Sequence, residues 1–184
     1  MKPPMKTSLW RAAIGVPALS LALLAMPGTA QATTAAPAAT RAGTSVQAPA
    51  AALVTKLTHS QATSRFRAAG ITWSSSGGCS DRNNPTCTSF EQINLATVQG
   101  AETLKSASGC ALNITGGTET GHASGTYSHW NGYKLDYSLS TCLNNYITSR
   151  FTYIGGSKYQ SGSGNIYFRE SNHWDVTYYN CGGC

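Results

Sequence analysis

The sequence has few charged residues, and its basic residues are not clustered. Lysine and arginine together number 13, against seven aspartates and glutamates, in 184 residues. Proteins that bind nucleic acid usually carry a lysine- and arginine-rich patch, so the absence of one argues against nucleic acid as a partner. A second long apolar run is also missing after the N-terminal one, and no internal repeat is visible. The sequence therefore predicts no membrane anchor after its first segment.

Residues 1–32 have the three parts of a secretory signal peptide. A basic start with Lys2, Lys6 and Arg11 precedes the apolar run AAIGVPALSLALLAM, and Ala30-Gln31-Ala32 forms a small-residue cleavage site. The apolar run is shorter than the roughly 20 residues that a bilayer span needs. We therefore expect a secreted protein, extracellular or associated with the cell wall, that no membrane holds after the signal is cleaved.

The mature chain is expected to contain one domain behind a linker. Residues 33–52 are rich in alanine, threonine and proline and contain no aromatic residue, which predicts a linker or pro-segment. Residues 53–184 have the length of one ordinary domain, which we expect to be a monomer. Removing the signal leaves 13 − 3 = 10 basic and seven acidic residues, a net charge of about +3 that suits an anionic cell wall.

All six cysteines lie in the mature part of an exported chain, so disulfides are the expected state. Six thiols allow 15 pairings. Proximity in the sequence favours three local pairs: Cys79 with Cys87, Cys110 with Cys142, and Cys181 with Cys184. The last pair could instead be a zinc knuckle or a redox motif, but the chain has neither a second C-x-x-C nor a thioredoxin-like context. We expect a structural disulfide there.

Hydrophobic periodicity predicts a mixture of helices and strands. Thr88 and Glu91 form a capping box before a helix over residues 90–105, which Gly109 would end. A second helix is expected after Ser140 or Thr141. Strands are expected at 112–115, 133–139, 165–170 and 174–179, with a glycine-rich loop at 155–164. The order predicts an α+β fold in a disulfide-stapled single domain, with a small antiparallel sheet and two or three helices.

Several side chains that could bind a metal follow one another in this pattern. His129 lies in a loop before the strand that carries Asp136, so the two can face one cleft and supply two zinc ligands. A catalytic zinc site usually has three protein ligands and an open position for water, and His173 is the best third candidate. Glu170, three residues earlier, can act as a general base toward that water. These residues together predict a zinc peptidase.

Other interpretations of the same residues stay open. Any one of them can be an ordinary hydrogen-bonding group in a polar loop, and His122 with His129 offers a rival ligand pair. Glu119 and His122 could support the metal ligands by hydrogen bonds, or cap the loop. Trp130, Tyr133 and Trp174 flank the candidate ligands; they could be core residues or the walls of a cleft for peptide or sugar.

The segment SHWNGYKLD, Ser128 to Asp136, has the form S-H-x-x-G-x-x-x-D, and Glu170 to His173 has the form E-x-x-H. In this order the two motifs resemble those of the M15-type zinc peptidases, the D-alanyl-D-alanine carboxypeptidase and dipeptidase group, which includes peptidoglycan endopeptidases. The resemblance covers about residues 110–179. It implies that His129, Asp136 and His173 hold zinc and that Glu170 is the catalytic base. The family usually has an arginine upstream, in a segment like SGYRS, where this chain has TGGTETGH.

The resemblance implies hydrolysis of peptide bonds in peptidoglycan stem peptides that contain D-alanine. The missing arginine and the disulfide density leave an alternative, a secreted module or inhibitor that binds the cell wall without catalysis. A third hypothesis is a small secreted ribonuclease that uses Glu170, His173 and Arg169 without a metal.

Overall fold

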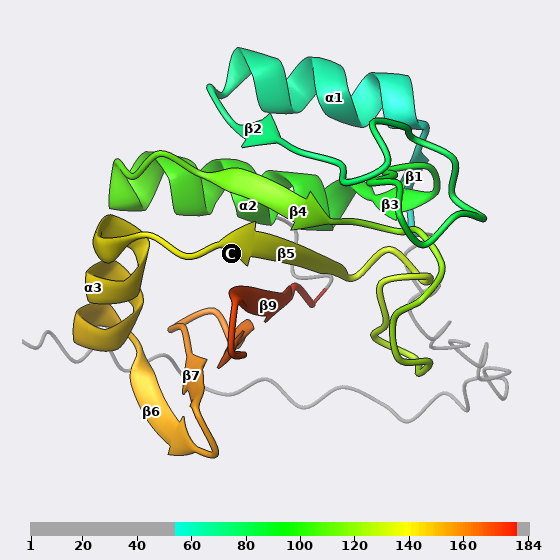
Figure 1. The fold of residues 1–184 in the computed structure, drawn as a ribbon. Helices are drawn as coiled ribbons and strands as arrows, with labels where there is room; N and C mark the ends of the chain where they lie inside the picture. Colours follow the sequence, from blue (N-terminus) through cyan, green and yellow to red (C-terminus); the bar gives the residue numbers. More distant parts are fainter. Residues whose placement is uncertain (1–53, 180–184) are drawn as a thin grey trace, which may run out of the picture. The chain divides into compact units, whose positions relative to one another are not determined.

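The computed structural model describes residues 54–179, which fold as an α+β domain as predicted. The predicted signal peptide (1–32), the predicted linker (33–52) and the predicted Cys181–Cys184 pair lie outside these residues. Figure 1 shows the elements along the chain. In chain order they are β1 (Lys56–Leu57), α1 (His59–Ala68), β2 (Thr72–Trp73), β3 (Ile93–Asn94), α2 (Leu95–Ser108), β4 (Asn113–Gly116), β5 (Lys134–Ser138), α3 (Thr141–Arg150), β6 (Thr152–Gly155), β7 (Lys158–Gln160), β8 (Ile166–Arg169) and β9 (His173–Thr177).

Seven strands form one sheet in the order β2-β4-β5-β9-β8-β7-β6, and β1 pairs with β3 separately. Only the β2–β4 pair of the seven-stranded sheet is parallel. The expectation of a mainly antiparallel sheet is thus confirmed, but the sheet is not small. The prediction of a loop at 155–164 was wrong for residues 158–160, which form β7, while Gly155 and Gly156 adopt positive φ angles and turn β6 back onto β7. The hairpin projects from the lower part of the view in Figure 1.

Helix α2 begins five residues after the predicted start at residue 90, with Asn94 as its N-cap, and ends at left-handed Gly109 as expected. The predicted capping box does not form. The Thr88 hydroxyl lies within hydrogen-bonding distance of the carbonyl oxygens of Ser74 and Thr115 (2.8 and 3.2 Å), and Glu91 accepts from the amide of His59 (2.8 Å). Long-range partners therefore compete successfully with the local cap.

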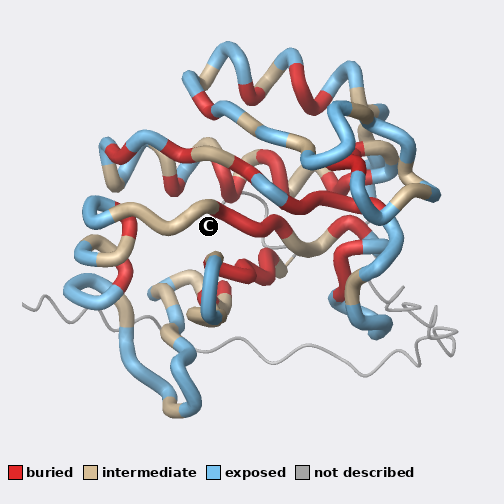
Figure 2. Tube along the Cα trace, viewed as in Figure 1, coloured by how far each residue is buried: buried red, intermediate tan, exposed pale blue. Residues whose placement is uncertain are grey.

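The two faces of the central strands differ in chemistry. Leu135, Tyr137, Trp174 and Val176 are almost completely buried in the hydrophobic core, which they share with apolar residues of all three helices. Because side chains alternate along a strand, the residues between them point to the opposite face. These residues are Lys134, Asp136 and Ser138 of β5 and His173, Asp175 and Thr177 of β9. Figure 2 shows β5 and β9 as largely buried segments, and Asp136, Asp175 and Thr177 on the polar face are themselves buried.

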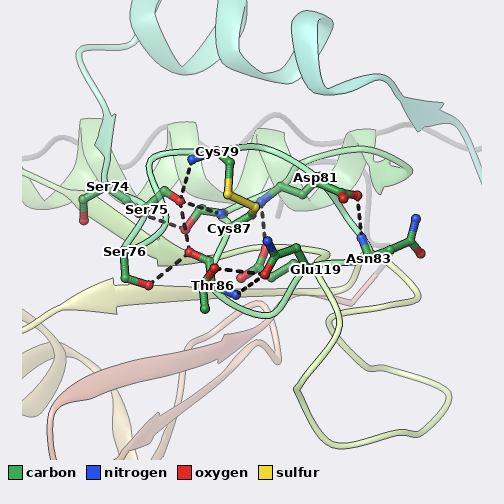
Figure 3. Close-up of a disulfide and its surroundings, with 12 residues drawn as sticks. Ser74, Ser75, Ser76, Cys79, Asp81, Asn83, Thr86, Cys87 and Glu119 are labelled. Atoms are coloured by element: carbon green, nitrogen blue, oxygen red, sulfur yellow. Dashed lines mark hydrogen bonds between the residues drawn. A yellow bond between two sulfur atoms is a disulfide. The ribbon is translucent and has the colours of Figure 1, made fainter.

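Two disulfides join segments around this core, Cys79–Cys87 and Cys110–Cys142, which confirms two of the predicted pairs. No free cysteine occurs within residues 54–179. The first bond closes a loop after β2, shown in Figure 3, where the Ser75 hydroxyl oxygen accepts from the amides of Cys79 and Thr88. No helix in the same range has the length and apolar character needed to cross a bilayer.

Candidate metal centre

Neighbouring strands bring two of the predicted ligands together. Asp136 of β5 lies opposite Asp175 of β9, and His173 lies opposite Ser138. Asp136 and His173 are therefore diagonal neighbours on one face of the sheet, within reach of long side chains. The Nε2 atom of His173 lies 3.5 Å from Oδ1 of Asp136. Asp136 and Glu170 are 34 positions apart in the sequence. The register of β5 on β9 thus brings together the two motifs that contain them.

The third predicted ligand, His129, lies on a loop that is anchored to the start of α2. Gly132 has a φ of 78°, and a Cβ atom there would lie 2.6 Å from the carbonyl oxygen of Gln92. The Gly132 carbonyl in turn accepts hydrogen bonds from the Asn94 amide (3.1 Å) and the Thr97 hydroxyl (2.7 Å). The glycine of the S-H-x-x-G motif is therefore a backbone requirement, because no larger residue fits this close approach.

The hydrogen bonds of His129 determine which nitrogen faces the site. Nδ1 lies 2.7 Å from the carbonyl oxygen of Gly117, which can only accept, so Nδ1 carries the proton. In a neutral ring Nε2 is then a second acceptor, and it lies 3.3 Å from Oδ1 of Asp136. Both atoms are buried and have no hydrogen-bond partner among the described residues. Two acceptors in this position require a proton or a metal cation between them.

The pKa values at the site show the same need for positive charge. Burial by itself would lower the pKa of His129, but the carboxylates of Asp136 and Asp175 outweigh burial and raise it to about 9. Burial would raise the pKa of Asp175, but His129 and the ammonium group of Lys134, 2.8 Å away, lower it to about 2. The metal-free site therefore holds a proton on His129, which a metal would have to displace.

The structure also places His122 in the cluster. His122, His129 and Asp136 form a group whose potential ligand atoms all lie within 4.8 Å of one another, and this group could hold a metal ion. The His122 ring stacks on the His129 ring, with centroids 3.8 Å apart and planes inclined by 15°. Its Nδ1 lies 3.7 Å from Oδ2 of Asp136, and its Nε2 lies 3.2 Å from Glu119. His173 contacts Asp136 without belonging to this group.

Glu119 has a buried carboxylate that contacts both His122 and nearby backbone amides. It accepts hydrogen bonds from the amides of Ser89 (2.7 Å) and Gly117 (2.9 Å) in addition to its contact with His122. Burial alone would raise its pKa, but these hydrogen bonds outweigh burial and hold the pKa below its ordinary value. Figure 3 shows Glu119 beside the Cys79–Cys87 loop. At the stretch where the M15-type pattern has arginine, this chain thus has an anion that supports His122.

Glu170 lies at the turn between β8 and β9, where its amide donates to the carbonyl of His173 (3.0 Å). Its side chain is 37% exposed, and Oε2 lies 3.5 Å from Nε2 of His173. The other ring nitrogen of His173, Nδ1, lies 2.8 Å from Oδ1 of Asn172. Arg169 pairs with Trp174 across the strands, so its side chain points to the other face of the sheet.

The three flanking aromatic residues have different environments. Trp174 is a core residue with 1% exposure, on the opposite face from the ligands, and Tyr133 is partly buried. Trp130 is exposed and lies against Arg82, whose guanidinium is 3.7 Å from the ring centroid. Ser128 is buried, and its hydroxyl accepts from the amide of Asn131 (3.2 Å). Of the three aromatic residues, Trp130 lines a cavity of 320 Å³ together with His122.

Two residues near the centre carry no signal that sequence reasoning could have recognised. A Cβ atom on Gly116 would lie 2.4 Å from Oδ2 of Asp136, so only glycine leaves room for this carboxylate. Arg82 lies 47 residues from His129 in the chain, yet it donates to the carbonyls of Thr118 and Trp130 on the loop that carries this histidine. No family model, no curated protein and no solved structure matches this chain.

Proposed function

We propose that this domain is a secreted zinc-dependent peptidase that hydrolyses peptide bonds in peptidoglycan stem peptides. The observation that carries the proposal is the convergence of two histidines on one carboxylate oxygen. Nε2 of His129 and Nε2 of His173 lie 3.3 and 3.5 Å from Oδ1 of Asp136. Glu170, a potential base, lies 3.5 Å from the same nitrogen of His173.

The two distances to Oδ1 of Asp136 suit a tetrahedral ion, whereas His173 lies outside the group of ligand atoms that are all within 4.8 Å of one another. Zinc binds histidine nitrogen and carboxylate oxygen at about 2.0–2.2 Å, so neighbouring ligand atoms of a tetrahedral site are about 3.3–3.6 Å apart. Nδ1 of His129 faces the carbonyl of Gly117, and Nδ1 of His173 faces Oδ1 of Asn172. Such contacts are typical of metal-binding histidines, because they leave the lone pair of Nε2 for the ion.

The stacking of His122 on His129 favours His173 as the third ligand. The lone pair of an imidazole nitrogen lies in the ring plane, so a histidine holds its metal close to that plane. The two rings are nearly parallel with centroids 3.8 Å apart, so an ion in the plane of one ring lies well outside the plane of the other. His122 is also held by Glu119 through Nε2. We therefore assign His129, Asp136 and His173 as ligands, and His122 as a neighbouring group.

Bound at this position, zinc would polarise the scissile carbonyl and lower the pKa of water. Glu170 would take a proton from the attacking water and pass it to the leaving amine. Its partial exposure and its position at a strand turn leave this carboxylate accessible to water and substrate. The carboxylate of Asp175, paired with Lys134, lies 3.8 Å from the same Nε2 atom of His129 and would add negative charge beside the ion. The stem-peptide substrate is inferred from the resemblance to M15-type peptidases.

The first experiment is measurement of zinc by mass spectrometry in protein purified without chelators. We expect about one zinc ion per chain, lost in His129→Ala and in His173→Ala and retained in His122→Ala. Zinc that survives in His173→Ala but not in His122→Ala would contradict the ligand assignment. Absence of zinc, even after its addition, would overturn the metal site.

Catalysis is tested separately with Glu170→Gln. This change keeps the size of the side chain but removes the base, so we expect normal zinc content without hydrolysis of stem peptides. Normal turnover would refute the role of Glu170. Zinc binding by the wild type without any product release would favour the alternative, a non-catalytic module that binds the cell wall.

The ribonuclease hypothesis has less support in the geometry. The Arg169 guanidinium donates to the backbone carbonyl of Glu170 and lies 5.8 Å from the ring centroid of Trp174. Since Trp174 and His173 point to opposite faces of β9, Arg169 does not join His173 and Glu170 in one site. RNA cleavage that survives EDTA would support that hypothesis against this geometry.

A further inference from the structure

A second cavity lies on the other face of the sheet from the metal centre. It has a volume of 450 Å³ and lies between α3 and the strands β6, β7 and β8. Its lining includes Asn144, Thr148, Tyr153, Tyr159, Arg169 and Trp174. Arg169 and Trp174 pair across β8 and β9, on the face opposite His173 and Asp175. The cavity therefore shares a strand turn with the metal centre but none of its proposed ligands.

A series of aromatic rings leads from solvent into this cavity. Tyr153 is 60% exposed, and its ring centroid lies 5.2 Å from that of Tyr159, at an inclination of 56°. Tyr159 in turn meets the buried Trp174 in an edge-on contact with centroids 5.9 Å apart. Ile154, the next residue on β6, is also exposed. Of the three rings, Tyr153 is the exposed one, and an aromatic ring presented to water is typical of a surface that binds a ligand.

Two side chains beside the rings, Asn144 and Arg169, offer hydrogen-bond donors. Trp174 Nε1 donates to Oδ1 of Asn144 (2.8 Å), which orients the amide and leaves its NH₂ group without an acceptor in the described part of the chain. The Arg169 guanidinium uses one nitrogen for the carbonyl of Glu170. Its remaining N–H groups have no acceptor among residues 54–179 either. No carboxylate lines the cavity, so its donors are open to a ligand rich in acceptor oxygens.

We propose that this cavity is a binding site for a glycan chain, and in particular for a β-1,4-linked pyranose. Equatorial substituents leave the two faces of such a ring lined by C–H groups, which can pack on Tyr153 and Tyr159. The hydroxyl or acetamido oxygens at the ring edge would accept from Asn144 and Arg169. The volume lies in the range of small-molecule sites, about 300–1,000 Å³. The proposal does not depend on the peptidase activity.

The test is calorimetric titration with two defined probes, the β-1,4-linked hexamers of N-acetylglucosamine and of glucose. We expect binding of at least one hexamer, weakened roughly twofold to tenfold by Tyr153→Ala and preserved in Tyr153→Phe, because stacking needs the ring and not the hydroxyl. Tyr153 is largely exposed, so its removal leaves the fold intact. Tyr127→Ala, at another exposed tyrosine outside the cavity, should bind normally.

His129→Ala should also bind normally, which separates this proposal from that of the metal site. Failure of both hexamers to bind would overturn the glycan site. Equal affinity of Tyr153→Ala and the wild type would overturn it as well, because the glycan would then bind elsewhere. Loss of affinity in Tyr127→Ala comparable to that in Tyr153→Ala would likewise exclude a specific role for this cavity.

Discussion

Substitution of Gly116 by alanine tests the geometry of the candidate metal centre without removing a proposed ligand. The added Cβ atom would lie 2.4 Å from Oδ2 of Asp136 and 3.0 Å from its Cγ. Carbon atoms normally pack at about 3.5–4.0 Å, so the clash with this carboxylate is about 1 Å or more. Strand β5 lies between β4 and β9 in the sheet, so it cannot move away freely. Relief must therefore come mainly from rotation of the Asp136 side chain.

The expected cost has two parts. Overpacking a buried site typically costs about 1–3 kcal/mol of stability. Misorientation of a metal ligand typically weakens metal binding about 10–100-fold. We expect both effects in Gly116→Ala, measured as the free energy of unfolding in chelator and as the zinc dissociation constant by competition with a chromogenic chelator.

Gly162→Ala is the matched control. An added Cβ atom there meets no atom within 4 Å, and neither glycine has a left-handed φ. The control should therefore change stability by no more than about 0.5 kcal/mol and leave zinc binding unchanged. Wild-type zinc affinity in Gly116→Ala, with the domain folded, would refute the view that Asp136 must keep its present position to bind the metal.

Two further predictions concern stability. The pKa of Asp175 is about 2 in the folded state and 3.8 in an unperturbed carboxyl, so its ion pair stabilises the metal-free domain above pH 3.8 and this contribution is lost as the pH falls toward 2. The free energy of unfolding of the wild type, measured in urea, should fall over this pH interval by at most about 2 kcal/mol more than that of Asp175→Asn. An equal fall in both proteins would contradict the ion pair. Replacement of Cys110 and Cys142 by alanine opens a disulfide that spans 32 residues, which should cost about 3–4 kcal/mol by the loop-closure model, measured by thermal and urea unfolding. An unchanged midpoint would show that the bond does not constrain the unfolded chain.

Local chemistry explains the elements that were predicted well. Ser140 caps α3 because its hydroxyl accepts from the Leu143 amide (3.1 Å) three residues on, and Gly109 ends α2 because glycine adopts a left-handed φ of 65° without strain. The alternation around Asp136 identified β5 because both faces of the strand have a regular chemistry. Each of these signals depends on residues that are close in the sequence.

Long-range partners explain the elements that were predicted wrongly. Thr88 and Glu91 have the spacing of a capping box, yet Thr88 is close to carbonyls of two distant segments and Glu91 binds the start of α1. A true capping box forms at Thr58 and Gln61 instead, at the start of α1. A local pattern cannot tell which of two available partners a side chain will have, because the competing partner lies far away in the sequence.

The sequence by itself determined the α+β class, two local disulfides and the residue types of a candidate metal site in two short motifs. Only the tertiary structure decided which of these residues meet. The register of β5 on β9 brings His173 to Asp136, and the anchoring of the Gly132 carbonyl at α2 brings His129 to the same oxygen. Tertiary packing also brought the Ser89 amide to Glu119 and Gly116 against Asp136. Such approaches depend on strand register and on hydrogen bonds between distant segments, which no local periodicity specifies.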